Sequence, residues 1–222
     1  MRNLWLLLLL AGFLVPSAHA QHHHEHQHSD DATIDHRFEK AEDWAKRFED
    51  PERDAWQLPD QIVEQLCSRA DLKIADIGSA TGYFPVRFAK ACPEGQVFGS
   101  DIEPDMVFYL NDRARKEGLE NLVSVLAAPE NPHLPTQVDL VFICNTYHHI
   151  NGRRDYFRRL QSQLLPGGKV AIVDFRVDSK RGPPHKLARE SVIEEMAAAG
   201  YGVTEQHEFL PDQYFLVFEV EE

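Results

Sequence analysis

The stretch that decides the fold is Ile74-Ala75-Asp76-Ile77-Gly78-Ser79-Ala80-Thr81-Gly82-Tyr83. Its apolar start predicts a strand, the two glycines predict a turn, and Pro85 favours a helix start just after it. Glycines let a ligand approach the backbone, and the start of the following helix offers free N–H groups. The stretch therefore predicts a site for a nucleotide-like ligand, with an ordinary structural turn as the alternative.

A second acidic residue closes the next apolar segment. Residues 96–101 predict a strand that ends at Asp101, about 20 residues after the turn, where nucleotide-binding folds place a carboxylate that holds a ribose. A cap on the helix that starts near Pro104 is the alternative role. The spacing of Gly78 and Gly82 departs from G-x-G-x-x-G, which disfavours a nicotinamide dehydrogenase.

Strands and helices are expected to alternate along the chain. Strands are expected near 73–77, 96–101, 121–126, 138–144 and 169–175, and helices near 84–91, 104–117, 152–164 and 187–199. Such alternation predicts a parallel, doubly wound sheet. The last strands, near 203–209 and 213–220, are joined by a turn too short for a parallel crossover. The expected fold is α/β, a Rossmann-like doubly wound seven-stranded sheet that is mostly parallel with an antiparallel C-terminal hairpin.

Four motifs in order resemble those of the class I S-adenosylmethionine (SAM) methyltransferases. They are the glycine turn, Asp101, the apolar segment 138–145 and the Leu-Leu-Pro-Gly-Gly-Lys segment 164–169, and the likeness covers roughly residues 72–220. Within that family the chain is similar to the quinone-biosynthesis C-methyltransferases. The resemblance implies a SAM-dependent methyltransferase that acts on a small-molecule acceptor.

The resemblance also implies the residues of the cofactor site. The turn would surround the methionine and ribose parts of SAM, Asp101 would hold the ribose hydroxyls, and Ile102 would pack on the adenine. Many relatives carry an Asp at the adenine edge, where this chain has Ala127 and Ala128, so a backbone group must serve there or the contact is lost. The implied cofactor-binding residues are Asp76, Gly78, Ser79, Gly82, Asp101, Ile102, Ala127, Asn145 and Thr146.

The candidate catalytic residues follow the strand near 138–144. Tyr147, His148 and His149 lie at its carboxyl end, where open α/β sheets bind ligands. Either histidine can accept a proton near neutral pH, and Tyr147 can orient an acceptor. A structural role for the histidines is the alternative, since methyl transfer from a sulfonium mainly needs proximity and alignment.

Two further segments are candidates for the acceptor site. Trp56 lies in a segment that resembles the N-terminal lid of small-molecule methyltransferases, and it either walls the acceptor site or packs in the core. The basic segment 180–186 either attracts an anionic acceptor or is a solvated loop.

The chain is expected to divide into four segments. Residues 1–20 combine Arg2, an apolar run and an A-x-A-like end, which predicts a signal peptide and a periplasmic or secreted protein with no stable membrane span after cleavage. Residues 21–35 form a His-rich tail, 36–70 an N-terminal helical lid, and 71–222 the methyltransferase domain.

The His-rich tail is a candidate metal site. Cleavage after Ala20 would leave an amine with histidine third, an arrangement that suits Cu(II) or Ni(II), and the other histidines can hold Zn(II). Cyclisation of Gln21 would remove that amine, and a soluble spacer is the alternative. An exported metal-binding or scaffold protein that keeps the fold without turnover is therefore the second function considered. The implied ligands are His22, His23, His24, His26 and His28.

The net charge and the cysteine content argue against a nucleic-acid-binding protein and against a disulfide-stabilised scaffold. The 222 residues carry 36 acidic and 23 basic side chains, a net charge of −13, which argues against a nucleic-acid partner. Cys67, Cys92 and Cys144 are too few for a disulfide framework and favour free thiols, although the first two can pair in an exported protein.

Overall fold

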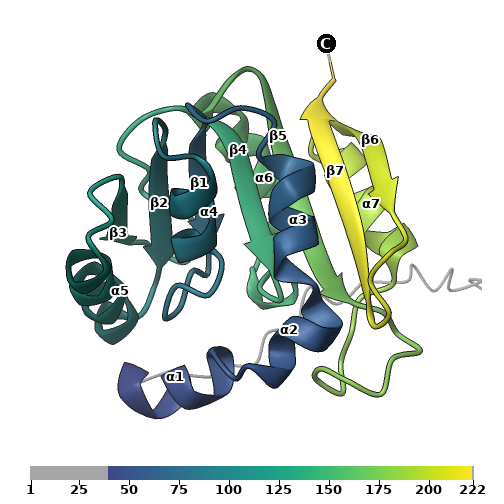
Figure 1. Cartoon of the computed structure of the whole chain (residues 1–222). Coiled ribbons are helices and arrows are strands. Elements are labelled where there is room, and N and C mark those ends of the chain that lie inside the picture. Colours follow the sequence, from purple (N-terminus) through teal and green to yellow (C-terminus); the bar gives the residue numbers. More distant parts are fainter. Residues whose placement is uncertain (1–39, 222) are drawn as a thin grey trace, which may run out of the picture.

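The computed structural model describes residues 40–221, which are built around one seven-stranded sheet (Figure 1). The strand order is β3-β2-β1-β4-β5-β7-β6. The strands are β1 Lys73–Ile77, β2 Gln96–Asp101, β3 Leu122–Leu126, β4 Val138–Cys144, β5 Leu164–Phe175, β6 Tyr201–His207 and β7 Gln213–Val220. Strands β1 to β5 pair in parallel, and β7 runs antiparallel to both β5 and β6. The predicted Rossmann-like sheet with an antiparallel C-terminal hairpin is confirmed.

Helices cover both faces of the sheet because successive buried strand residues point to opposite sides (Figure 1). On one face, Ile74 and Phe142 join a core with α3 (Pro59–Leu66), α4 (Pro85–Ala91) and α5 (Pro104–Glu117). On the other, Ala75 and Val141 join a core with α6 (Arg153–Leu160) and α7 (Arg189–Ala198). The two cores hold the strands, so the loops at the carboxyl ends of the parallel strands are fixed relative to one another.

Several element boundaries differ from the sequence prediction. Strand β5 begins at Leu164 rather than near 169, because Leu164 pairs with Val138 and the Pro-Gly-Gly segment stays in the strand. Strand β6 begins two residues earlier than expected, at Tyr201, which pairs with Val220. The helix expected over 152–164 ends at Leu160 and continues as a short 3₁₀ turn, η2 (Gln161–Gln163).

The N-terminal helices lie across the edge where β1, β4 and β5 end (Figure 1). Helix α1 spans Ala41–Phe48. A second short helix, α2 (Glu52–Gln57), follows it. The carboxyl edge of the sheet is thus covered by α1 and α2, whereas α3, later in the same N-terminal segment, packs on one face of the sheet.

The predicted signal peptide (1–20) and His-rich tail (21–35), with the metal ligands His22 to His28, lie outside the described residues. Within residues 40–221, no helix is long and apolar enough to cross a membrane.

Candidate active site

The turn after β1 can be built only with glycines. Gly78 and Gly82 have φ angles of 76° and 97°, in the left-handed region that disfavours other residues. A Cβ on Gly78 would come within 2.3 Å of Thr146 Oγ1, and one on Gly82 within 2.3 Å of Leu110 Cδ1. The predicted turn is present, and its backbone packs directly against Thr146, just after β4, and against Leu110 of α5.

Asp101 fixes the turn from the neighbouring strand. Its Oδ2 accepts the Ala80 N–H at 2.8 Å and its Oδ1 accepts the Glu103 N–H at 3.0 Å. Burial raises the pKa of the Asp101 carboxyl, and these two N–H groups oppose that shift. The acid thus holds the turn and the backbone just before α5, while the N-cap of that helix is Glu103 and has no side-chain cap bond.

Two apolar side chains stand exposed beside Asp101. Ile102 is 53% exposed and Leu126, which pairs with Asp101 across β2 and β3, is 50% exposed. The backbone N–H groups at this edge are already used, since Ala127 donates to the Asp101 carbonyl and Ala128 to the Asn131 carbonyl, both at 2.8 Å. This edge therefore presents a ligand with the apolar surface of Ile102 and Leu126, while the N–H groups of Ala127 and Ala128 are bonded within the protein.

Asp76 at the end of β1 lies opposite a cation from α2. Burial raises the pKa of the Asp76 carboxyl well above its usual range, while the Arg53 guanidinium lowers it. Arg53 itself stacks over the Tyr83 ring at 3.8 Å and donates to the Phe48 carbonyl at 2.7 Å. A buried carboxylate and a fixed cation therefore meet beside the glycine turn.

A chain of amide side chains links α2 to the ends of β4 and β7. Arg53 Nε donates to Gln57 Oε1 at 2.7 Å, and Gln57 Nε2 donates to Gln213 Oε1 at 2.5 Å. Gln213 Nε2 then donates to Asn145 Oδ1 at 2.6 Å. Asn145 holds a φ of 55°, which asparagine tolerates better than most residues. Gln57 and Gln213 are buried, so this chain fixes Asn145 at the site.

A buried His–Asp pair follows Asn145. His148, on the 3₁₀ turn η1 (Tyr147–His149), places Nδ1 2.8 Å from Asp174 Oδ2, near the end of β5. The His148 ring lies 4.2 Å from the His149 ring and 6.1 Å from the His185 ring, measured between centroids. Three imidazoles and one carboxylate thus gather at the carboxyl edge.

Tyr147 has a different environment from its two neighbours. Its buried hydroxyl donates to Glu195 Oε2 at 2.8 Å, on α7, and Arg153 Nε binds the same carboxylate oxygen at 2.6 Å. The Tyr147 ring stacks on Phe157 at 5.2 Å between centroids. The structure therefore separates the hydroxyl of Tyr147 from the imidazole pair, on the α6–α7 side of the sheet.

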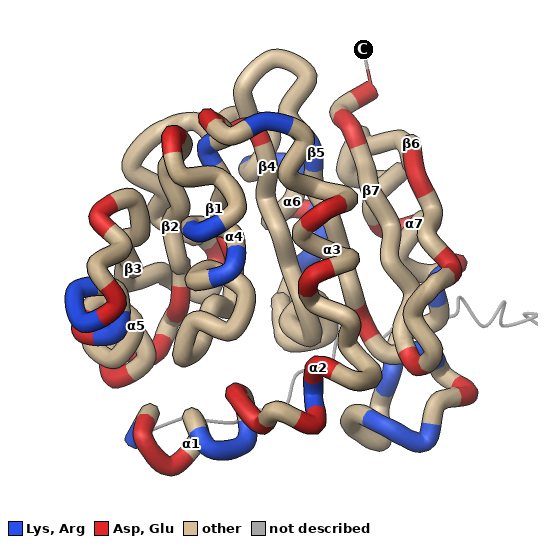
Figure 2. The backbone as a smooth tube through the Cα atoms, viewed as in Figure 1, with Lys and Arg blue, Asp and Glu red and all other residues tan. Residues whose placement is uncertain are grey.

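An aromatic surface and a basic loop lie next to the His–Asp pair. The Trp56 ring is 5.8 Å from the Phe175 ring, and the Arg181 guanidinium lies 5.1 Å from the Trp56 centroid. Figure 2 shows Lys and Arg along the loop between β5 and α7, close to α2. Both acceptor-site segments considered from the sequence are therefore brought together.

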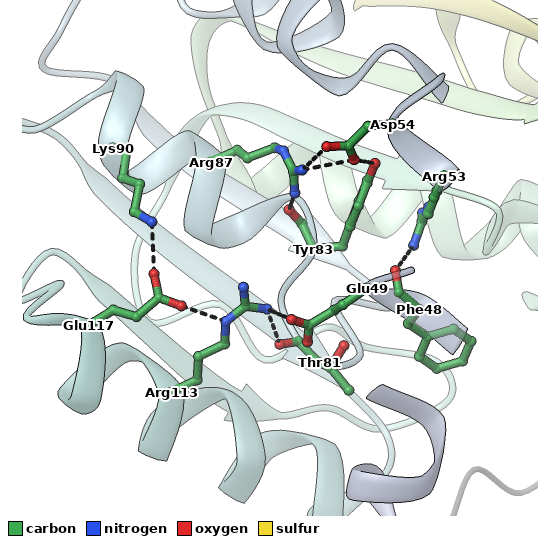
Figure 3. A network of polar contacts seen from close by, with 10 residues as sticks. All are labelled: Phe48, Glu49, Arg53, Asp54, Thr81, Tyr83, Arg87, Lys90, Arg113 and Glu117. Carbon is green, nitrogen blue, oxygen red and sulfur yellow. Dashed lines mark hydrogen bonds and ion pairs between the residues drawn. The ribbon is translucent and has the colours of Figure 1, made fainter. Parts of the chain in front are cut away.

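Ion pairs hold α1 and α2 onto the glycine turn (Figure 3). Arg113 on α5 donates to the Thr81 carbonyl at 3.0 Å and pairs with Glu49 at 2.8 Å, so it ties the turn to the α1–α2 junction. Arg87 on α4 pairs with Asp54 at 2.9 Å, and Tyr83 donates to the same carboxylate. These contacts fix α2, and with it Arg53 and Trp56, over the site.

Known proteins share this sequence pattern and fold. A family model described as a methyltransferase domain matches residues 74–168, which include the glycine turn, Asp101 and the His148 segment. These residues form a methyltransferase domain, and the relatives support one of the class I SAM-dependent type. Its 27-O-demethylrifamycin SV methyltransferase relative from Amycolatopsis mediterranei is 30% identical over 149 residues, which cover 66% of this chain and 53% of the relative. A ubiquinone/menaquinone biosynthesis C-methyltransferase from Shewanella frigidimarina is 26% identical, over 58% of this chain and 50% of the relative.

Solved structures agree on the fold. A SAM-dependent methyltransferase from Aquifex aeolicus superposes with a TM-score of 0.74 at 20% identity, covering 80% of this chain and 97% of that one. The magnesium protoporphyrin IX methyltransferase from Synechocystis, solved with S-adenosylhomocysteine (SAH) bound, superposes with a TM-score of 0.61 at 15% identity, covering 78% and 86% of the two chains. This methyltransferase family member spans about half the length of the curated relatives it matches.

Several site residues of this family member were not singled out from its sequence. Gly99 lies under the turn, where a Cβ would come within 2.9 Å of Ser79 Oγ, and a lone glycine inside an expected strand signals such an approach. Asp174 could have been found because it ends the next parallel strand at the same edge. Gln57 and Gln213 gave no sequence signal, since 156 positions separate them.

Other polar groups in residues 40–221 lie apart from this site. A hollow lined by Asp71, Lys73 and Glu94 is at the opposite edge, where β1 begins. No group of three or more His, Cys, Asp or Glu side chains in the described part of the chain is arranged to hold a metal ion.

Proposed function

We propose that this protein transfers a methyl group from SAM to a small-molecule acceptor that binds between Trp56 and His148. The observation that carries the proposal is the glycine turn fixed by Asp101, with the exposed Ile102 and Leu126 beside it. When bound, SAM supplies a methyl carbon already activated by a sulfonium. The chain has to bind it, orient the acceptor and, for some acceptors, remove a proton.

The residues at and beside the turn fit SAM in four ways. Gly78 and Gly82 let the turn adopt left-handed φ angles and pack against Thr146 and Leu110, which sets the path of the backbone beside the ligand. Each carboxylate oxygen of Asp101 accepts one N–H and has a lone pair left, so it can also accept ribose hydroxyls. Ile102 and Leu126 offer an apolar surface for adenine. The Asp76 carboxyl and the Arg53 guanidinium offer polar partners for the amino-acid end of SAM.

The His148–Asp174 pair supports proton removal from the acceptor. A neutral imidazole whose Nδ1–H donates to the Asp174 carboxylate has its lone pair on Nε2. In that tautomer His148 accepts the acceptor's proton at Nε2, and the buried Asp174 carboxylate stabilises the imidazolium that forms. His149 and His185 shape the same region.

Titration calorimetry of the protein with SAM and SAH tests the cofactor assignment. We expect dissociation constants in the micromolar range for both, and no binding of a nicotinamide dinucleotide at the same concentration, because the glycine spacing does not suit a pyrophosphate. A folded sample that binds neither SAM nor SAH would contradict the proposal and favour a scaffold protein that keeps the fold without turnover.

The acceptor is proposed to combine a flat apolar body with an anionic group. Trp56 and Phe175 supply aromatic faces, and Arg181 lies over Trp56 with about half of its side chain exposed. Arg181→Gln is expected to raise KM about fivefold for a carboxylated phenol, amine or enol acceptor without changing kcat, because exposed cations contribute modestly. Arg115→Gln, which makes the same charge change on α5, is the matched control. An equal KM for both variants would remove the anionic group from the proposal.

We also propose that the chain is exported, to the periplasm or the medium, and that its His-rich tail binds Cu(II), Ni(II) or Zn(II). The sequence of residues 1–35 supports both statements. N-terminal sequencing of the chain recovered outside the cytosol, followed by Cu(II) titration of a peptide covering 21–28, tests them. A first residue other than Gln21, or the absence of equimolar Cu(II) binding at pH 7, would count against the tail site.

A further inference from the structure

Two cysteine side chains meet on the face of the sheet that carries α3 and α4. Cys67 ends α3 and Cys92 ends α4, and their Sγ atoms lie 2.8 Å apart. A disulfide bond is about 2.05 Å long, so the two sulfurs are less than about 1 Å from bonding distance. The third cysteine, Cys144, lies at the end of β4, where its Sγ accepts a hydrogen bond from Gln57 Nε2 at 3.2 Å.

We propose that Cys67 and Cys92 form a disulfide that cross-links α3 to α4. Both residues sit on ordered backbone, since the Cys67 N–H donates to the Val63 carbonyl and the Cys92 N–H to the Phe88 carbonyl, each at 2.8 Å. The Cys92 carbonyl also accepts the Asn121 side chain at 3.1 Å. The backbone therefore presents the two sulfurs to each other, and the bond needs only a small side-chain movement.

The reaction requires a disulfide donor, either a small molecule or a protein. The thiolate of Cys67, the half-buried member of the pair, attacks a donor sulfur and releases one donor thiolate. The thiolate of the fully buried Cys92 then attacks Cys67 Sγ and releases the second donor thiolate. Two electrons pass from the two cysteines to the donor. The donor disulfide becomes two thiols, which take up the two cysteine protons, and the two cysteine thiols become one disulfide.

The surroundings of the pair favour a lasting cross-link over a rapid switch. Burial raises the pKa of both thiols, and their mutual contact raises that of Cys67 further. Since the thiolate is the reacting form, exchange in either direction is slow. The bond would close a loop from Cys67 to Cys92 that contains β1, the glycine turn and α4, and it would anchor the end of the N-terminal helices to the sheet.

Thiol counting on the whole protein tests the bond directly. The chain is incubated at pH 8 with oxidised glutathione, denatured, alkylated with N-ethylmaleimide and weighed by mass spectrometry. We expect one alkylated cysteine per chain, Cys144, in place of the three of a dithiothreitol-treated sample, and a peptide that joins Cys67 to Cys92. Three alkylated cysteines after oxidation, or a bond that involves Cys144, would overturn the proposal.

Thermal unfolding provides the second test, with Cys67→Ser as the matched variant. Oxidation is expected to raise the Tm of the natural protein by about 10 °C, from the loss of unfolded-state freedom in a closed loop of this length. The Cys67→Ser Tm should not respond to oxidation and should match that of the reduced natural protein. An equal Tm shift in both proteins would contradict the cross-link. SAM binding is measured separately, so failure of the cofactor proposal leaves this one standing.

Discussion

Gly78→Ala is expected to weaken SAM binding about 100-fold. The alanine would have to hold a φ of 76°, which costs about 1–2 kcal/mol, and its Cβ would stand 2.3 Å from Thr146 Oγ1. The turn must then shift away from β4, and the backbone that the ligand approaches moves with it. A loss of about 2.7 kcal/mol in binding free energy corresponds to about 100-fold in the dissociation constant.

Gly118→Ala is the matched control for this variant. Gly118 caps α5 with a φ of 68°, and a Cβ there would meet no atom within 4 Å. Its substitution imposes the same kind of backbone strain away from the turn, so it should lower the free energy of unfolding by about 1 kcal/mol and leave the SAM dissociation constant unchanged. Calorimetry on both variants, with circular dichroism to verify folding, checks this expectation. Equal SAM affinity in the two variants would separate the glycine turn from cofactor binding.

The predictable parts of this protein are those that local sequence determines. The glycine turn, its strand and the proline-started helix α4 are encoded within about 20 consecutive residues, and β1, β2 and β4 were placed at their observed bounds. The prediction failed where pairing with a distant strand determines a boundary. Strand β5 begins early because Leu164 pairs with Val138, although the Pro-Gly-Gly segment that follows Leu164 disfavours a strand.

In the candidate site, too, the sequence predicted what adjacent residues determine and missed what distant residues determine. The backbone cradle and Asp101 could be placed from spacing, since their positions follow from one strand–turn–helix unit and the next strand. The partners that orient the catalytic candidates could not. Asp174 lies 26 positions from His148, and the Gln57–Gln213 bond joins α2 to the far end of the chain. Tyr147, adjacent to His148 in sequence, is turned toward Glu195 by packing that the sequence does not display.

His148→Gln is expected to lower kcat by about 100- to 1,000-fold while the SAM dissociation constant changes less than twofold. Glutamine keeps the size and polarity of the side chain but cannot take up a proton, and general base catalysis contributes factors of this order. Asp174→Asn should cause a similar loss, because an amide can donate to Nδ1 and so favour the tautomer whose Nε2 carries the proton. His207→Gln, on β6 and two strands away from β5, is the matched control and should keep its kcat.

The pH dependence of kcat distinguishes a base from a structural residue. Only a neutral imidazole accepts a proton, so an enzyme that uses one as its base should lose kcat as the pH is lowered. That acid limb should be absent in His148→Gln, which has no imidazole at this position. His149→Gln should keep the acid limb and lose less than about tenfold in kcat. The His149 ring contacts the His148 ring at 4.2 Å between centroids, whereas the hydrogen bond to Asp174 is made by His148. If His148→Gln retains both its rate and its acid limb, the Asp174–His148 pair holds the loop after β4 in place, and the acceptor reacts without losing a proton to the protein.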